Sequence, residues 1–310
     1  MKKFQLLLLV IITNFFAQQT FCQTAKVIKH ENVVYGMISG MALLMDVYQP
    51  EQSNHLGIVY IVGSGFGAPA LYRKIYNQVP LKDDYVLDSA YTGKWIKSLN
   101  NEGYTVFVIN HRFTPAFHFP EIFYDCQRAV RFIRFNAKEY GIDADHIGAM
   151  GQSSGANLSA MLGVTDTTIA RPESPIDGVS SKVQAVVTMA APFVLSEMDT
   201  PTDTLPLMKY YLKLVLDYIG EMPEIKNNQF ISSGKYAQAS PITHVTGDDA
   251  PFLIYYSEND PIIPVRQATM MCEKLRDAGV PFKEVKNPDQ GHNPIPDMQE
   301  VDNWFRQYLK

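Results

Sequence analysis

Short runs of consecutive apolar residues alternate along this chain with longer stretches in which apolar residues recur every three or four positions. The short runs predict buried strands, and the longer spacing predicts amphipathic helices. The predicted strands occupy residues 43–48, 57–62, 105–110, 146–150, 183–189, 252–257 and 282–285. The predicted helices occupy residues 88–101, 120–140, 155–162, 265–278 and 296–309.

Several predicted strands are apolar on both sides instead of alternating between apolar and polar residues. Residues 106–109, for example, read Val-Phe-Val-Ile. Such a strand must be covered on both faces, and strands that alternate with helices favour parallel pairing through right-handed crossovers. We therefore expect an α/β fold with a mostly parallel central sheet flanked by helices, formed by residues 23–310 as a single domain.

One segment, residues 193–239, departs from the alternation. It contains no predicted strand, only an amphipathic stretch at residues 207–219 between proline-containing loops. We interpret it as a small helical insertion, a lid or cap, packed over one end of the sheet. An ordinary crossover of unusual length is the alternative.

The first 22 residues differ in composition from the rest. Two lysines precede an apolar run at residues 6–12, and small residues, Thr20 and Cys22, are placed to precede a cleavage site. This pattern is typical of a secretory signal peptide, and the run is well short of the roughly 20 residues that span a bilayer. We predict that residues 1–22 are removed, that the protein is secreted or periplasmic, and that it has no stable membrane insertion.

Charge and composition exclude several classes of protein. Lys and Arg number 27 against 32 for Asp and Glu, without a basic block, so nucleic-acid binding is not expected. The 46% hydrophobic content supports a globular core. The two cysteines beyond the leader, Cys126 and Cys272, are predicted to be buried free thiols. No HExxH or CxxC motif occurs, so we expect neither a metal nor an organic cofactor.

A GxSxG motif, Gly151-Gln-Ser153-Ser-Gly155, lies directly between a predicted strand and a predicted helix. In that context the serine sits on a tight turn that exposes its hydroxyl above the sheet, which predicts a nucleophile. A glycine-bearing turn with an incidental helix cap is the alternative reading.

A serine nucleophile needs a histidine base and a carboxylate that orients the base. His292 follows a glycine in the loop between the last strand and the last helix, and we predict it as the base, with His244 as the alternative. Asp260 follows the strand at residues 252–257, at the carboxyl edge where catalytic groups gather in parallel sheets. Glu258 is the competing carboxylate.

The reaction also needs donors for the negatively charged oxygen of a tetrahedral intermediate. The loop Gly63-Ser64-Gly65 directly follows the strand at residues 57–62, and we predict N–H groups of this loop and of Ser154 as the oxyanion hole. The same loop also fits a GxGxxA dinucleotide fingerprint, but no helix signal or suitably placed acidic residue follows it.

Five segments can be compared with known families: residues 59–66 (VYIVGSGF), 110–125 (NHRFTPAFHFPEIFYD), 140–155 (YGIDADHIGAMGQSSG), 260–264 (DPIIP) and 291–292 (GH). Together they resemble the α/β-hydrolase superfamily, in the branch of bacterial esterases and lipases that includes hormone-sensitive-lipase-like carboxylesterases and acetyl and feruloyl esterases. The resemblance implies the nucleophile, acid and base at Ser153, Asp260 and His292. The chain departs from the family pattern at three positions. The family usually has histidine at the position of Val62 and glycine at that of Ser64, and it commonly has alanine at that of Ser154.

The resemblance implies a serine carboxylesterase that hydrolyses small acyl esters, with acetyl or feruloyl groups on polysaccharides as candidate substrates. A serine peptidase or amidase of the same fold is an alternative, although such peptidases usually carry a large additional domain. A non-catalytic hydrolase fold used for binding is another alternative, and it would typically lack one of the three catalytic residues.

Overall fold

The computed structural model describes residues 26–67, 92–166, 174–195, 206–222, 224–226, 229–231 and 233–310. The predicted signal peptide lies outside the described residues, as does the start of the helix predicted at residues 88–101.

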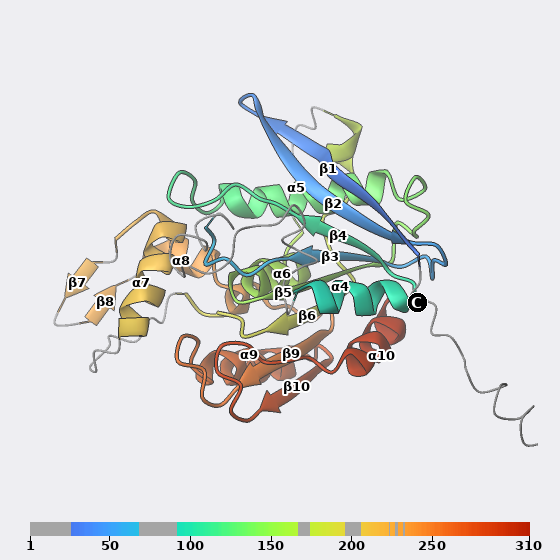
Figure 1. The fold of residues 1–310 in the computed structure, drawn as a ribbon. Coiled ribbons are helices and arrows are strands. Elements are labelled where there is room, and N and C mark those ends of the chain that lie inside the picture. Colours follow the sequence, from blue (N-terminus) through green and yellow to red (C-terminus); the bar gives the residue numbers. More distant parts are fainter. Residues whose placement is uncertain are drawn as a thin grey trace, which may run out of the picture.

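An eight-stranded sheet forms the centre of the molecule, in the order β1-β2-β4-β3-β5-β6-β9-β10 (Figure 1). The strands are β1 (Val27–Ile38), β2 (Met41–Pro50), β3 (Gly57–Ile61), β4 (Thr105–Ile109), β5 (Ile147–Gln152), β6 (Ala185–Met189), β9 (Phe252–Ser257) and β10 (Phe282–Asn287). The β1–β2 and β2–β4 pairs are antiparallel, and all the other pairs of neighbours are parallel. The carboxyl ends of β3, β4, β5, β6, β9 and β10 therefore lie at one edge.

Helices cover both faces of this sheet. They are α4 (Thr92–Asn101), α5 (Glu121–Phe135), α6 (Ser154–Val164), α9 (Arg266–Ala278) and α10 (Met298–Tyr308). Alternate residues of β3 enter two different cores: Val59 and Ile61 join the one formed with α5, α6 and α9, and Ile58 and Tyr60 join the one formed with α4 and α10. This two-sided burial is the physical reason for the unbroken apolar sequence of the central strands.

The expected α/β architecture is thus confirmed, and most predicted elements are present with shifts of a few residues at their ends. The prediction that the chain contains no strand between residues 193 and 239 was wrong, because β7 (Glu224–Lys226) and β8 (Gln229–Ile231) form a small antiparallel hairpin. Strand β1 was also missed. Apart from the buried Tyr35, its residues are half-buried or exposed, and the polar residues 29–32 interrupt the apolar run that identified the other strands.

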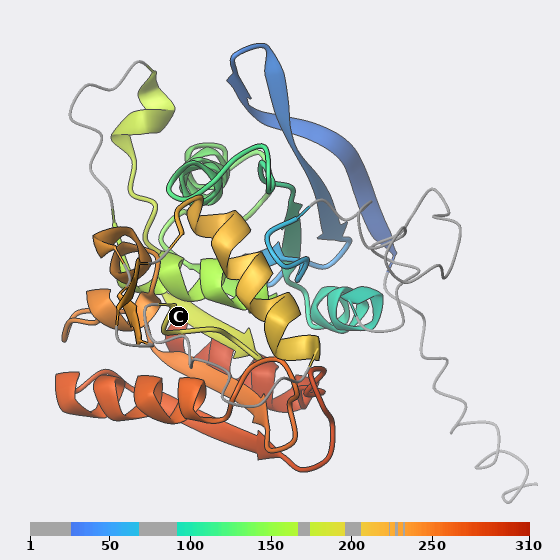
Figure 2. The same ribbon diagram turned by 90° about the vertical axis from the view of Figure 1, so that its left-hand side faces the viewer.

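The predicted insertion contains two helices, α7 (Pro206–Ile219) and α8 (Gly234–Gln238), besides the β7–β8 hairpin. Figure 1 shows these elements gathered beyond the carboxyl ends of the parallel strands, and Figure 2 shows α7 crossing in front of that edge. The insertion therefore lies at the edge where the predicted catalytic residues emerge.

Candidate active site

The predicted nucleophile stands on a strained turn between β5 and α6. Ser153 has φ 53° and ψ −123°, a left-handed conformation that is uncommon for a residue with a side chain. The turn closes so tightly that a β-carbon at Gly151 would lie 2.4 Å from the carbonyl oxygen of Gly155, and one at Gly155 would lie 2.1 Å from that of Ile61. The Ser153 N–H donates to the carbonyl of Met189 at 2.8 Å, which anchors the turn to β6.

Ser153, His292 and Asp260 form a continuous chain of hydrogen bonds. The His292 Nδ1 lies 2.8 Å from Oδ2 and 3.1 Å from Oδ1 of Asp260, and its Nε2 lies 2.9 Å from Ser153 Oγ. Since the carboxylate can only accept, Nδ1 carries the proton and Ser153 donates to Nε2. The side chain of Asp260 is 2% exposed and that of His292 is 19% exposed, so the carboxylate is shielded from solvent while the base is partly accessible.

Backbone groups fix the carboxylate of Asp260. Its Oδ1 accepts hydrogen bonds from the N–H groups of Ile262 at 2.8 Å and Ile263 at 2.9 Å. These donors hold the carboxylate in place beside the imidazole and compensate for its burial.

The two alternative residues lie elsewhere. His244 belongs to the short 3-10 helix Pro241–His244, and its Nε2 lies 2.7 Å from the carbonyl oxygen of Gln238. Glu258 forms an exposed ion pair with Lys286 at 2.7 Å. Neither is recorded in contact with Ser153 or with His292, so the geometry favours His292 and Asp260.

Three further side chains connect the loops of the site, and the sequence analysis missed them. Asn259 Oδ1 accepts from the Gly291 N–H at 2.8 Å, which ties the loop after β9 to the histidine loop. Gln152 Nε2 donates to Asn293 Oδ1 at 2.6 Å, which ties the nucleophile turn to the same loop. The sequence marks these three residues only by their position: each is adjacent to a predicted catalytic residue.

The predicted oxyanion loop lies directly beside the nucleophile turn. A β-carbon at Gly63 would lie 3.2 Å from Ser153 Cβ. The Ser64 N–H donates to Ser154 Oγ at 2.9 Å, in a buried contact. This N–H is therefore engaged within the protein. Among the described residues, no such contact engages the N–H groups of the other predicted donors, Gly63, Gly65 and Ser154.

Helix α7 packs against the same loop. Phe66, with φ 63°, stacks on Tyr218 with ring centroids 3.7 Å apart and planes 4° apart. The Phe119 N–H donates to the Tyr218 carbonyl at 2.7 Å, and His118 Nδ1 lies 2.7 Å from the carbonyl oxygen of Asp217. The insertion thus holds both the oxyanion loop and the segment that precedes α5.

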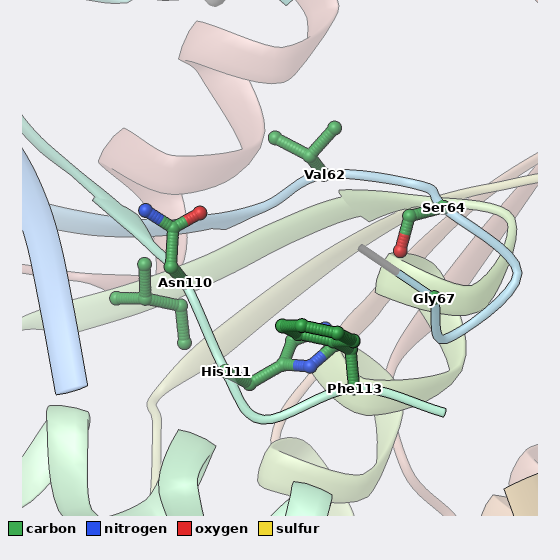
Figure 3. Close-up of a pocket in the computed structure, with 7 residues that line it drawn as sticks. Val62, Ser64, Gly67, Asn110, His111 and Phe113 are labelled. Carbon is green, nitrogen blue, oxygen red and sulfur yellow. The ribbon is translucent and has the colours of Figure 1, made fainter. Parts of the chain in front are cut away.

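A small pocket of about 140 Å³ lies between the oxyanion loop and the segment that follows β4. Its lining residues are Val62, Ser64, Gly67, Ile109, Asn110, His111 and Phe113. Figure 3 shows the Ser64 hydroxyl pointing from the loop toward the side formed by His111 and Phe113. A buried ion pair holds the segment that carries His111 and Phe113, since the Arg112 N–H and guanidinium both donate to Asp125.

Within the ranges given above, no group of three or more His, Cys, Asp or Glu side chains has metal-binding geometry. None of the helices in that part of the chain is long and apolar enough to cross a membrane. Cys126 and Cys272 are both buried and free, as predicted.

This arrangement has a defined chemical capacity. A serine hydroxyl that donates to a neutral imidazole, itself oriented by a buried carboxylate, can attack an electrophilic carbonyl carbon. Main-chain N–H groups next to the attacking oxygen can hold the charge that develops on the carbonyl oxygen.

Comparison with known proteins gives independent evidence of the family to which the chain belongs. Residues 45–275 match the model of the family described as BD-FAE. A relative from Mycobacterium tuberculosis, described as "Probable carboxylic ester hydrolase LipM", is 29% identical over 174 residues, which are 56% of this chain and 38% of that protein. The chain spans less than half the length of the first curated relatives that it matches.

Solved structures with the same fold cover nearly the whole chain. A structure described as "Truncated form of carbohydrate esterase from gut microbiota" has a TM-score of 0.68 and 24% identity, and covers 93% of this chain and 98% of its own. A second, described as "Bifunctional GH43-CE" from Bacteroides eggerthii, has a TM-score of 0.67 and 26% identity, and covers 90% of this chain and 38% of its own.

Proposed function

The chain belongs to the BD-FAE family of α/β-hydrolase carboxylesterases, and from this premise we propose that it is a serine carboxylesterase that hydrolyses small acyl esters. One observation carries the proposal: the uninterrupted hydrogen bonds from Ser153 Oγ through His292 to Asp260. In this geometry the hydroxyl can donate to Nε2 and the carboxylate can accept from Nδ1, which is the arrangement that acyl transfer requires at the start of the reaction.

The first half of the reaction forms an acyl-enzyme. Ser153 Oγ attacks the ester carbonyl carbon while its proton moves to His292 Nε2, and Asp260 stabilises the resulting imidazolium. The carbonyl oxygen becomes an oxyanion held by the Gly65 and Ser154 N–H groups. The intermediate then collapses, the bond to the alcohol oxygen breaks, and Nε2 returns the proton to the leaving alcohol.

The second half releases the acid. His292 Nε2 takes a proton from water, and the hydroxide attacks the carbonyl carbon of the acyl-enzyme. The second tetrahedral intermediate expels Ser153 Oγ, which recovers its proton from Nε2. The 19% exposure of the His292 side chain gives water access to the base.

The proposed substrates are acetyl or feruloyl esters of polysaccharides. The descriptions of the carbohydrate esterase and the GH43-CE protein support this class, as does the proposed export of the chain after loss of residues 1–22. A secreted or periplasmic enzyme would meet such polymers outside the cytoplasm.

The test is turnover of p-nitrophenyl acetate and acetylated xylan by the purified protein and by Ser153→Ala. We expect the wild type to hydrolyse the acetate and the variant to lose on the order of 10⁵- to 10⁶-fold in kcat. A fluorophosphonate probe should add to the wild type only, with the mass increase on the peptide that contains Ser153. A wild type that hydrolyses no ester would contradict the proposal, and a fully active variant would exclude Ser153 as nucleophile.

A further inference from the structure

The loop that carries His292 does not hold its own conformation. Asp289 and Gly291 are both left-handed, with φ 55° and φ 57°. A glycine adopts this conformation freely, but Asp289 bears a side chain and adopts it only at a cost. Residues 288–293 are half-buried or exposed, so packing against a core contributes little. Contacts from neighbouring elements must therefore keep the loop in the conformation that the hydrogen bonds of His292 require.

Ser257, the last residue of β9, makes such a contact. It is 1% exposed. Its Oγ accepts a hydrogen bond from the Gln290 N–H at 3.1 Å and donates one to Asn259 Oδ1 at 2.9 Å. Because an amide oxygen can only accept, the hydroxyl hydrogen points at Asn259, and a lone pair of Oγ is left for Gln290. The hydroxyl is thus used both as a donor and as an acceptor.

Asn259 extends the contact to the next residue of the loop. Its Oδ1 also accepts from the Gly291 N–H at 2.8 Å, and its Nδ2 lies 3.4 Å from Asp289 Oδ1. Two consecutive N–H groups, those of Gln290 and Gly291, are therefore held by oxygen atoms at the end of β9. The residue that follows them is the base.

These bonds join the loop of the base to the loop of the acid. Ser257 lies three residues before Asp260, and it is paired with Asn287 at the end of β10. On the other side of His292, the bond from Gln152 to Asn293 is exposed to solvent. A hydrogen bond is stronger in a buried setting than in water, so the bond of the Ser257 hydroxyl is the firmer of the two attachments.

We propose that Ser257 is a positioning residue for the catalytic base. It acts through Gln290 and Asn259, which together hold the loop against the strain at Asp289. General-base catalysis needs the imidazole within hydrogen-bond reach of the Ser153 hydroxyl. A loop that relaxes lowers the fraction of molecules with a complete triad, and therefore lowers kcat. The proposal rests on the proposed esterase function and adds a residue that sets the position of the base.

The experiment measures hydrolysis of p-nitrophenyl acetate by Ser257→Ala, by Asn259→Ala and by the variant that carries both changes. Ser257→Thr keeps the hydroxyl and serves as the conservative replacement. Melting temperatures of all variants show that each one is folded.

Two matched controls lie at the opposite edge of the sheet. Ser181→Ala removes a fully buried hydroxyl that donates to Asp166 at 3.0 Å in the segment before β6. Asn54→Ala removes a side chain before β3 whose Oδ1 accepts from the Leu56 N–H at 2.9 Å and whose Nδ2 donates to the Glu102 carbonyl at 2.9 Å. Both controls lose hydrogen bonds of the same kinds without touching the histidine loop.

We expect Ser257→Ala to lower kcat by about thirtyfold, the equivalent of about 2 kcal/mol or two hydrogen bonds, with KM changed by less than about twofold. Asn259→Ala should lower kcat by about fivefold, since its bonds are closer to solvent. The double variant should lose less than the product of the two single losses, because Ser257 acts partly through Asn259. Ser257→Thr should keep most of the rate, and both controls should keep all of it.

A second measurement reports the base without turnover. The hydrogen between His292 Nδ1 and Asp260 gives a far-downfield proton resonance when it is held in a strong hydrogen bond. This resonance should be sharp in the wild type and the controls, and broadened or absent in Ser257→Ala, because a loosened loop exposes the hydrogen to exchange with water.

Three results would overturn the proposal. They are an unchanged kcat in Ser257→Ala, a loss of rate that the two controls share in proportion to their melting temperatures, and a loss of rate while the resonance stays sharp. A wild type that hydrolyses no ester would instead refute the proposed function. The resonance of Ser257→Ala against that of the wild type would still decide whether Ser257 positions His292.

Discussion

The side chain of Ser154 occupies a position between the nucleophile turn and the oxyanion loop. It is 2% exposed, and its Oγ accepts from the Ser64 N–H at 2.9 Å. The hydroxyl therefore fixes how far the loop lies from the attacking oxygen. A donor that is misplaced by a fraction of an ångström stabilises the oxyanion less, so this residue acts on the rate through position.

Replacing Ser154 by Ala should lower kcat by about fivefold, the equivalent of one hydrogen bond of roughly 1 kcal/mol, with little change in KM. Ser154→Thr keeps the hydroxyl and should retain most of the rate. Ser159→Ala is the matched control, because it removes a buried hydroxyl from the same helix α6 without a recorded contact to the loop. Steady-state kinetics on p-nitrophenyl acetate decide the point, and an unchanged or higher kcat for Ser154→Ala would be inconsistent with this role.

The carboxylate of Asp260 determines which nitrogen of His292 carries the proton. In Asp260→Asn the amide can present a donor to Nδ1, which favours the wrong tautomer, and kcat should fall by about 10⁴-fold. Glu258→Gln, two residues earlier, changes an exposed carboxylate that pairs with Lys286 and should leave kcat within about twofold. If both variants lost activity to the same extent, the assignment of Asp260 would be untenable.

At the scale of single residues, the sequence was sufficient to identify the candidate nucleophile, base and acid. Ser153, His292 and Asp260 each follow a strand and each belong to a residue type that acyl transfer needs. Asn259 and Gln152 were missed because an amide at a loop position has no distinctive pattern, and its partner is known only once the loops are folded together. The engagement of the Ser64 N–H could not be predicted either, because it depends on the side-chain orientation of Ser154.

Helix α7 acts at the scale of an element. It meets the oxyanion loop twice, through the Tyr218 ring on Phe66 and through the half-buried Leu214 beside Gly65. Gly65 has φ +61°, and a β-carbon there would lie 2.7 Å from Leu214 Cδ1. The glycine is therefore required both by the backbone conformation and by the closeness of the helix.

Gly65→Ala should lower kcat by at least about tenfold, because the loop must move away from α7 or change its left-handed conformation, at roughly 1–2 kcal/mol. In the double variant Gly65→Ala, Leu214→Ala the contact is relieved while the backbone strain stays, so part of the activity should return. Gly234→Ala in α8 is the control, since nothing lies within 4 Å of its β-carbon position. Activity of the single and double variants, measured with their melting temperatures, tests the coupling; a double variant no better than the single one would show that α7 does not constrain the loop.

Most strands could be predicted from the sequence when they are buried. Strands β3, β4 and β9 are buried on both faces and were visible as apolar runs, whereas β1 is half exposed and resembles a loop in its polarity. The β7–β8 hairpin has three residues in each strand, too few for any periodic pattern to develop. Local pattern therefore identifies the buried strands. Strand β10 is the exception, since it was predicted at residues 282–285 although its residues are half-buried or exposed.

At the scale of the whole molecule, one topological rule accounts for the site. Ser153, Asp260 and His292 are separated by 107 and 32 positions in the sequence, since 260 − 153 = 107 and 292 − 260 = 32. They meet because β5, β9 and β10 run parallel and end at one edge. The rule predicts at which edge of the sheet the three residues lie, but it does not predict the conformations of the loops. The hydrogen bonds of His292 to Ser153 and Asp260 could therefore be established only from the structure.

Strand β10 is the outermost strand of the sheet, paired only with β9, and its residues are half-buried or exposed. The loop that carries His292 begins where β10 ends. Heating should therefore fray this border before the interior melts. We expect hydrolysis to be lost several degrees below the midpoint of the far-ultraviolet circular dichroism transition, and to return on cooling from that interval. Coincident loss of both signals would contradict this. If activity is lost first, as expected, the protein has a reversible thermal limit that is set at the edge of the sheet and not in its core.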